Sequence, residues 1–466
     1  MNHSPEVVPP PTFTPGGRHG HRKPKQFGAG ARRALVLAMA VPVASAALVG
    51  PSAFAADGKT TATAPDTTPD TTPDTTPDTN DGLDSADQAI AANLNTRVID
   101  DRLGNNVSGV VLDAESDGTV WDHNGATALM PASNTKLATA TAALTVLGPD
   151  HRFKTKVVYG DGTLTLVGGG DRTLTTADLA AMAKDAVAGL KAAGLTGVKV
   201  AVDDSLFPEP TLANGWKPDY FPGDVAPVRA LVVDGHAVDD TSIDAGQVFA
   251  QQLAVDGITV DGEVTRRTAA VTDVPVSRHK SAELSDIVHH MIKVSDNNTA
   301  ETLLRMTALR AGQPATFEGG TTVVRDVLSR YGVSLENFEM YDGSGLSRAN
   351  RIPARTLAEI LDLLTEKRYE YLLSSIRDGL PVAGEADSTL APEWGRFDDP
   401  NSSCAVGKVH AKTGTLTGAI ALSGLTQGKD GRWKVFSFVE NDSTASGSAI
   451  KDAMDGLAAT VNGCWA

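Results

Sequence analysis

The sequence predicts an α/β (α+β) protein in which an antiparallel sheet is flanked by helices and a small α/β domain is inserted. Three strand patterns near the C-terminus are joined by short turns, which favours antiparallel pairing. Amphipathic helical patterns precede them. Residues 151–277 instead alternate strands and helices over a stretch long enough for a core of its own.

The folded part begins with a helix over 87–98 and a hairpin of strands at 107–113 and 118–121. The next helix starts near Ser133 and ends at Gly148-Pro149, because its apolar residues recur at helical spacing up to that break.

The insert and the remainder continue this pattern. The insert should hold a hairpin, two helices, a further strand and a second hairpin, in the segments 157–159, 164–166, 177–193, 198–202, 247–255 and 258–260. The elements expected after it are four helices, three strands and a last helix, in the segments 284–294, 299–309, 321–331, 354–366, 410–416, 419–425, 433–439 and 448–461.

Residues 1–55 have the composition of an export signal. Six Lys and Arg residues precede the apolar run 34–50, and Ala53-Phe54-Ala55 offers the small residues that a signal peptidase requires. An uncleaved membrane anchor is the alternative. Because Pro42 interrupts the run, we expect cleavage near Ala55 and an exported, extracytoplasmic protein whose mature form has no stable membrane span.

Residues 56–83 contain three Asp-Thr-Thr-Pro repeats and almost no apolar side chain, so we interpret them as a disordered tether. We therefore expect a catalytic domain made of 84–150 and 278–466, interrupted by an inserted domain at 151–277.

Charge and cysteine content exclude several functions. The formal net charge is −16, and because residues 1–55 are basic the rest is more acidic still, which argues against nucleic-acid binding.

The two cysteines, Cys404 and Cys464, lie in the exported part and most simply form one disulfide. Neither has metal-ligand spacing, so no metal or cofactor is expected. The sequence does not indicate the oligomeric state.

Ser133 and Lys136 stand three residues apart at a predicted helix start, which places them on one face. An unprotonated lysine amine beside a serine hydroxyl can remove its proton and make it a nucleophile. Lowering a lysine pKa from about 10.4 to about 7 requires roughly 4–5 kcal/mol, which burial and a second cation can supply. Alone, this motif also fits a capped surface helix.

Two later motifs complete the pattern. Ser295-Asp296-Asn297 lies between two helices, where it is also a plausible helix cap. Lys412-Thr413-Gly414 lies on a strand, where Gly414 permits close approach of a ligand backbone. Ser-x-x-Lys, Ser-x-Asn and Lys-Thr-Gly in this order are the combination found in penicillin-recognising serine enzymes.

With these motifs the chain resembles the class C low-molecular-mass penicillin-binding proteins, the serine D-alanyl-D-alanine carboxypeptidases and endopeptidases with an insert between the first two motifs. The likeness runs from about residue 90 to the C-terminus. It includes the segments 167–171, 202–205, 226–228, 295–301 and 342–348. The resemblance implies the penicillin-recognising serine-enzyme fold. Ser133 and Ser295 are 162 positions apart, fewer than in members with a longer, two-domain insert.

The resemblance also implies roles. Ser133 would attack the terminal D-Ala-D-Ala bond of peptidoglycan stem peptides, with Lys136 as base and Ser295 passing a proton to the leaving amine. Asn297 would hold the substrate amide, and Lys412 its terminal carboxylate. β-Lactams would be covalent inhibitors.

Further residues would contact substrate. Thr415 would share carboxylate binding and, with Ser133, supply the oxyanion-hole N–H groups. The remaining substrate-binding positions are Thr413, Gly414, Thr417, Arg348, Trp216 and Asp219, of which the last four match positions that grip the diamino acid of the stem in some members.

Other interpretations stay open. A β-lactamase or esterase on the same scaffold needs rapid deacylation, and a noncatalytic wall-binding module would keep only the fold. A Ser-His-Asp triad through His289-His290 lacks the G-x-S-x-G motif. The glycines 168–170 lack the neighbours of a phosphate-binding loop and predict a turn.

Overall fold

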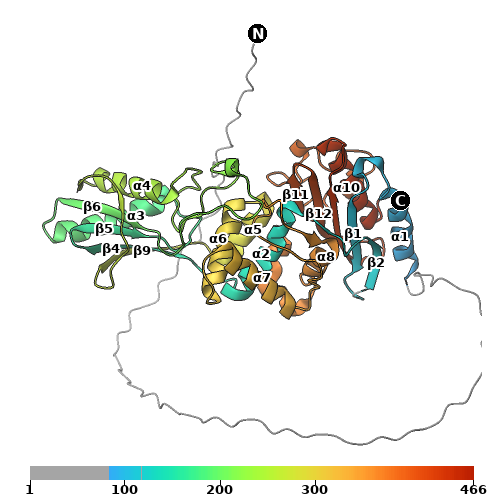
Figure 1. The fold of residues 1–466 in the computed structure, drawn as a ribbon, viewed down its shortest axis with the longest axis horizontal. Coiled ribbons are helices and arrows are strands. Elements are labelled where there is room, and N and C mark those ends of the chain that lie inside the picture. Colours follow the sequence, from blue (N-terminus) through green and yellow to red (C-terminus); the bar gives the residue numbers. More distant parts are fainter. Residues whose placement is uncertain (1–82, 117, 466) are drawn as a thin grey trace, which may run out of the picture. The chain divides into compact units, whose positions relative to one another are not determined.

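The computed structural model describes residues 83–116 and 118–465 (Figure 1). The expected export signal, and the tether up to residue 82, lie outside the described residues.

A five-stranded antiparallel sheet forms the centre of the catalytic part, in the order β11-β12-β13-β1-β2. The predicted N-terminal hairpin and the three C-terminal strands thus join one sheet, with Val111 of β1 opposite Phe436 of β13. The predicted fold class is confirmed. The strands are β1 (Val107–Asp113), β2 (Gly118–His123), β11 (His410–Leu416), β12 (Ala419–Gln427) and β13 (Trp433–Asn441).

Side chains alternate between the two faces of this sheet and enter two separate cores. Val110 and Val435 face the larger core, whereas Val111 and Phe436 face the smaller one. The smaller core is covered by α1 (Ser85–Arg97) and α10 (Gly447–Asn462), which lie side by side in Figure 1.

The larger core is built on the other face of the sheet by six helices. They are α2 (Thr135–Leu147), α5 (Leu284–Val294), α6 (Asn297–Arg310), α7 (Phe317–Arg330), α8 (Ala354–Asp362) and α9 (Glu370–Gly379). The sequence analysis predicted the first five but not α9. In α2 every residue from Thr135 to Leu144 is buried, because other helices and the sheet surround it. A two-stranded ladder of β3 (Ala128–Leu129) and β10 (Ile352–Pro353) lies beside it.

Residues 154–280 form a second sheet around a third core. Its elements are β4 (Lys154–Gly160), β5 (Thr163–Val167), α3 (Thr176–Ala192), β6 (Gly197–Asp203), α4 (Thr241–Val255), β7 (Thr259–Val260), β8 (Thr265–Arg266) and β9 (Val274–Lys280). The hairpin predicted from 258–260 is wrong: β7 and β8 each pair in parallel with β6 rather than with each other. We propose that 151–277 is one inserted domain.

One stretch of the insert leaves its own core and packs on the catalytic part. Ala213, Trp216 and Tyr220 belong to the larger core of the catalytic helices. The amide of Asn297 donates from Nδ2 to the carbonyl of Asp224, 2.9 Å away. This stretch therefore lies beside the second motif.

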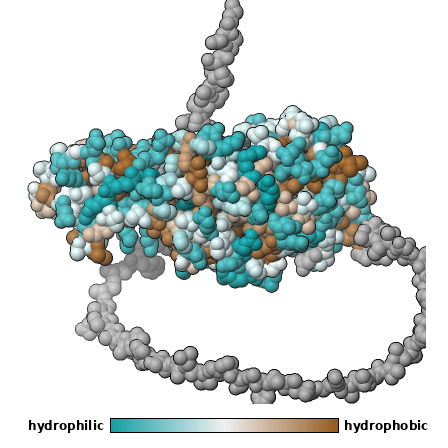
Figure 2. All heavy atoms as spheres, viewed as in Figure 1, coloured by the Kyte–Doolittle hydropathy of each residue, from teal (hydrophilic) through white to brown (hydrophobic). Residues whose placement is uncertain are grey.

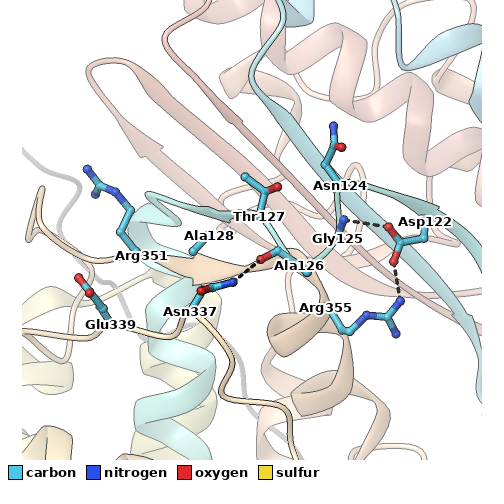
Figure 3. Close-up of a pocket in the computed structure, with 10 residues that line it drawn as sticks. All are labelled: Asp122, Asn124, Gly125, Ala126, Thr127, Ala128, Asn337, Glu339, Arg351 and Arg355. Atoms are coloured by element: carbon cyan, nitrogen blue, oxygen red, sulfur yellow. Dashed lines mark hydrogen bonds and ion pairs between the residues drawn. The ribbon is translucent and has the colours of Figure 1, made fainter.

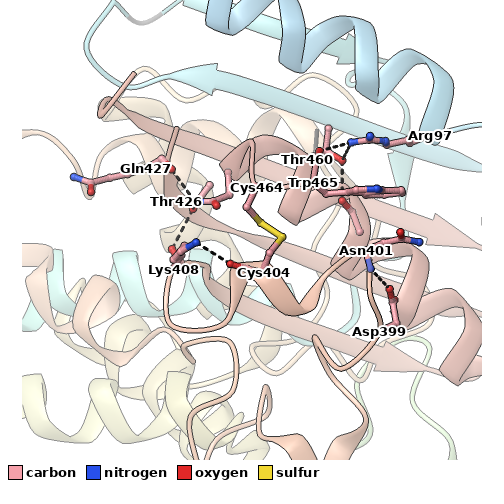
Figure 4. Close-up of a disulfide and its surroundings, with 12 residues drawn as sticks. Arg97, Asp399, Asn401, Cys404, Lys408, Thr426, Gln427, Thr460, Cys464 and Trp465 are labelled. Carbon is pink, nitrogen blue, oxygen red and sulfur yellow. Dashed lines mark hydrogen bonds between the residues drawn. A yellow bond between two sulfur atoms is a disulfide. The ribbon is translucent and has the colours of Figure 1, made fainter. Parts of the chain in front are cut away.

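Cys404 and Cys464 form a disulfide that joins the long connection before β11 to the segment that follows α10 (Figure 4). Within the connection, Lys408 donates from Nζ to the carbonyl of Cys404 at 2.8 Å. The disulfide therefore fastens the connection to the C-terminal end of the chain.

Removing this disulfide should lower the free energy of unfolding by about 2–4 kcal/mol, because it closes a loop with a sequence separation of 60. The double variant Cys404→Ser/Cys464→Ser, compared by thermal melting with the oxidised protein, measures this. Intact mass should be two hydrogens below that of the reduced chain. Free thiols, or equal melting temperatures, would contradict the prediction.

Among the described residues, no helix combines the length and the apolar content needed to cross a bilayer. On the face drawn in Figure 2, polar residues predominate and apolar ones occur in small groups.

Candidate active site

The first motif lies at the start of α2. A short 3-10 helix, Ala132–Asn134, leads into α2, and Ala132 has a left-handed backbone (φ 48°), which is uncommon for a residue with a Cβ. Asn134 contacts Ser423 of β12 at 2.7 Å and, with its amide nitrogen towards β11, also reaches the carbonyls of Lys412 and Thr413 at 3.0 and 3.1 Å. The serine segment is thus bound to the strand that carries the third motif.

Lys136 is fully buried and contacts three groups. Its Nζ lies 2.9 Å from Ser133 Oγ, 2.7 Å from Asn297 Oδ1 and 2.6 Å from the carbonyl of Ser344. Asn297 and Ser344 present only acceptor oxygens, so they take two N–H groups of a neutral amine. The remaining lone pair then faces Ser133, which is the arrangement of a base beside a nucleophile.

Burial lowers the pKa of Lys136 to about 8, against the opposing charges of Asp342, Asp296 and Glu301. Lys412 is equally buried, and burial together with the charge of Lys136 lowers its pKa well below the usual range. Of the two influences that the sequence analysis named, burial lowers the pKa of Lys136 itself, whereas the neighbouring cation lowers the pKa of Lys412.

The second and third motifs meet through Lys412. Its Nζ donates to Ser295 Oγ at 2.9 Å and to the carbonyl of Thr413 at 2.9 Å. Ser295 caps α5 in a left-handed conformation (φ 61°), which turns the chain so that Asp296 can cap α6 and Asn297 can face Lys136. All three motifs thus converge on one cleft.

Strand β11 is an edge strand, so alternate N–H groups point away from the sheet. The N–H of Ala411 donates outward to the carbonyl of Pro381 at 2.8 Å. By alternation, the N–H groups of Thr413 and Thr415 also point outward. The N–H of Thr415 is therefore directed as an oxyanion-hole donor must be.

Gly414 packs against the serine segment. A Cβ on it would lie 2.6 Å from the carbonyl of Pro131 and 3.2 Å from Ala132. The missing side chain therefore allows the segment before Ser133 to lie close to β11, and the approach of a ligand backbone to Gly414 stays a prediction.

The cleft is a hollow of about 280 Å³. It is lined by Ser133, Ser295, Thr389, Trp394, Arg396, Thr413, Thr415 and Lys451. The sequence analysis missed four of these: Thr389, Trp394 and Arg396 on the connection before β11, and Lys451 on α10. None belongs to a motif, and the only earlier signal was the expected disulfide, which links these two segments.

Two buried acidic residues, Glu301 and Asp342, contact Ser344, one of the partners of Lys136. Glu301 accepts hydrogen bonds from the N–H groups of Gly343 and Ser344 at 3.0 and 2.7 Å. Burial and the charge of Asp342 raise the pKa of Glu301 to about 7. Because the carbonyl of Ser344 contacts Lys136, this pair positions one of the partners of the base.

The four predicted stem-contact residues separate into two groups. Trp216 is only 7% exposed, and its indole N–H donates to Asp342 at 2.7 Å, so it is held mainly by packing within the protein. Asp219 and Thr417 are exposed, and Arg348 is half-buried and donates to the carbonyl of Thr417 at 2.9 Å.

A larger hollow, of about 770 Å³, lies elsewhere, between the end of β2 and the start of α8 (Figure 3). It contains no motif residue. Its charged side chains include the ion pair of Asp122 and Arg355, and Asn337 donates to the carbonyl of Ala126 at 3.3 Å. These contacts hold loops together, so we place the chemistry in the smaller cleft.

The fold and the cleft are those of a serine hydrolase of the penicillin-recognising class. The D-Ala-D-Ala carboxypeptidase 3 (S13) family model matches residues 90–238 and 235–461, and the chain belongs to this family.

Proteins of similar sequence that are named carboxypeptidases support this family assignment. The chain is 31% identical over 382 residues to carboxypeptidase DacB of Mycolicibacterium smegmatis, which covers 77% of this chain and 80% of that protein. It is 30% identical over 449 residues to the D-alanyl-D-alanine carboxypeptidase of Actinomadura sp., covering 75% and 80%.

Solved structures share the fold. Penicillin-binding protein 4 of Haemophilus influenzae matches with a TM-score of 0.67 and 22% identity, covering 82% of this chain and 99% of that one. The same protein complexed with a β-lactam matches with a TM-score of 0.61 and 25% identity, covering 80% and 98%.

Proposed function

We propose that this protein is a serine-type D-Ala-D-Ala carboxypeptidase that trims peptidoglycan stem peptides through an acyl-enzyme and is inhibited by β-lactams. D,D-endopeptidase action on peptide cross-links is a second reaction of the same site. The observation that carries the proposal is the environment of Lys136, whose Nζ lies 2.9 Å from Ser133 Oγ and whose other two partners are acceptor oxygens.

In the proposed mechanism, Ser133 Oγ attacks the carbonyl carbon of the penultimate D-Ala while its proton passes to neutral Lys136. The N–H groups of Ser133 and Thr415 stabilise the oxyanion. The C–N bond then breaks, and the departing amine receives, through the Ser295 hydroxyl, the proton that Lys136 took from Ser133, which returns Lys136 to its neutral form. Lys412 contacts Ser295 at 2.9 Å. Water hydrolyses the acyl-enzyme and regenerates the Ser133 hydroxyl.

The proposal extends to location. We propose that residues 1–55 direct export, with cleavage near Ala55, and that the mature protein acts outside the cytoplasm on the cell wall. The substrate is found there, and the Cys404–Cys464 disulfide suits an oxidising compartment.

Incubation with a defined muropeptide tests the activity: free D-alanine indicates carboxypeptidase action, and separated stems indicate endopeptidase action. A fluorescent penicillin distinguishes the alternatives. Long-lived labelling at Ser133 supports the peptidase, rapid release supports a β-lactamase or esterase, and no labelling supports a noncatalytic module.

Asp219 and Arg348 suit a stem residue that carries both an amine and a carboxylate. Burial raises the pKa of Tyr220. The charge of Arg348 lowers this pKa and the charge of Asp219 raises it, so Asp219 and Arg348 both lie near the Tyr220 side chain. We therefore expect Asp219→Ala to reduce kcat/KM by about tenfold for diaminopimelate-containing peptides, as for loss of one charged hydrogen bond.

Simple acyl-D-Ala-D-Ala peptides should be hydrolysed by Asp219→Ala at the wild-type rate. Asp326→Ala, on the exposed face of α7, provides the matched loss of a carboxylate. Equal losses on both substrates would reject amine recognition by Asp219.

A further inference from the structure

One wall of the active-site cleft carries unusual charge. Lys451 and Arg396 both line the cleft, close to Thr413 and Thr415, and none of the described residues that line it is a carboxylate. The cleft therefore favours an anionic ligand on this side.

The two lining cations differ in their partners. Arg396 is 4% exposed and forms a bidentate pair with the carboxylate of Asp455, its Nε lying 2.9 Å from Oδ2. Its charge is thus neutralised within the protein. Lys451 lies one helical turn before Asp455 on α10 and has no hydrogen bond or ion pair within 83–116 and 118–465.

The environment of Lys451 is poor for a lone ammonium group. It is half-buried, and burial together with the nearby charge of Arg396 lowers its pKa. The charge of Asp455 opposes this shift, but that carboxylate is paired with Arg396. A partly desolvated ammonium that makes no ion pair of its own is unfavourable, and an incoming carboxylate would relieve this.

This wall is rigidly held before any ligand arrives. The connection that carries Thr389 and Trp394 is joined to α10 by the Arg396–Asp455 pair and by the Cys404–Cys464 disulfide. Trp394, 62% exposed, lies on the same connection at the cleft. Preorganisation of this kind reduces the cost of ordering the site on binding.

We infer that Lys451 is a substrate-binding residue for the leaving group, whose carboxylate it receives opposite the hydroxyls of Thr413 and Thr415. The inference rests on the proposed function and names a contact outside the three motifs. Residues of β11 and α10 would then bind the free terminal carboxylate of the substrate from two sides, and this carboxylate would determine substrate specificity.

A pair of thioester substrates tests this. Both are acyl-D-alanyl thioesters; one has thioglycolate as leaving group, and the other has its methyl ester, which lacks the carboxylate. Lys451→Met should lower kcat/KM for the thioglycolate about tenfold, mainly through KM, since one charged hydrogen bond is lost. The methyl ester should react with Lys451→Met at the wild-type rate.

Lys451→Arg, which keeps the charge, should retain most of the thioglycolate activity. Lys184→Met removes an exposed lysine from α3 and should change neither substrate. Unchanged thioglycolate kinetics in Lys451→Met, or equal losses on both thioesters, would overturn the inference while leaving the proposed function intact. A wild-type protein inert towards both thioesters and towards penicillin would overturn both.

Discussion

Ser133→Ala should abolish labelling by a fluorescent penicillin and reduce peptide hydrolysis by a factor on the order of 10⁶, the scale seen when a serine nucleophile is removed. Ser133 Oγ contacts Lys136 Nζ at 2.9 Å and lines the cleft, and within residues 83–116 and 118–465 it is the one hydroxyl hydrogen-bonded to that amine. Gel fluorescence and D-alanine release measure the two effects.

The folded state should survive this substitution. Alanine keeps the helical start, and the three-residue turn does not depend on the hydroxyl, so the melting temperature should stay within a few degrees of wild type. Ser285→Ala, a half-buried serine at the start of α5, gives the matched loss of a hydroxyl and should keep full labelling. Labelling retained in Ser133→Ala would reject Ser133 as the nucleophile.

The residues proposed as catalytic could be selected from the sequence because each lies in a short local motif. Ser133 and Lys136 are one turn apart on any helix, and Lys412 and Thr413 alternate on any strand. Their convergence was a hypothesis, since it depends on contacts between segments far apart in the chain, such as Lys136 with Asn297.

What the sequence did not predict depends on long-range packing. The parallel pairing of β8 with β6 is invisible to local pattern, and so is the burial of Trp216 against Asp342. Trp394 lies on a connection that the Arg396–Asp455 pair joins to α10, and Lys451 lies on α10 itself, so both line the cleft through contacts between distant segments. Such residues form no motif, and only the folded chain reveals them.

Lys136 should control how activity depends on pH. A general base acts only when unprotonated, and the pKa of Lys136 is lowered to about 8. The value of kcat/KM should therefore rise as pH increases through about 8 and level off above it, because kcat/KM reports ionisation of the free enzyme. Penicillin acylation rates measured across this range should follow the same curve.

Substitution distinguishes proton transfer from charge at this position. Lys136→Met should reduce acylation by about 10²–10⁴, the usual contribution of a general base, and should flatten the pH profile. Lys136→Arg keeps the cation but does not lose its proton, so it should be impaired as well. If the arginine variant kept wild-type rates, Lys136 would act through its charge alone. Because Lys412 lies beside it with a lowered pKa, a rise through pH 8 that persisted in Lys136→Met would instead assign the titration to Lys412.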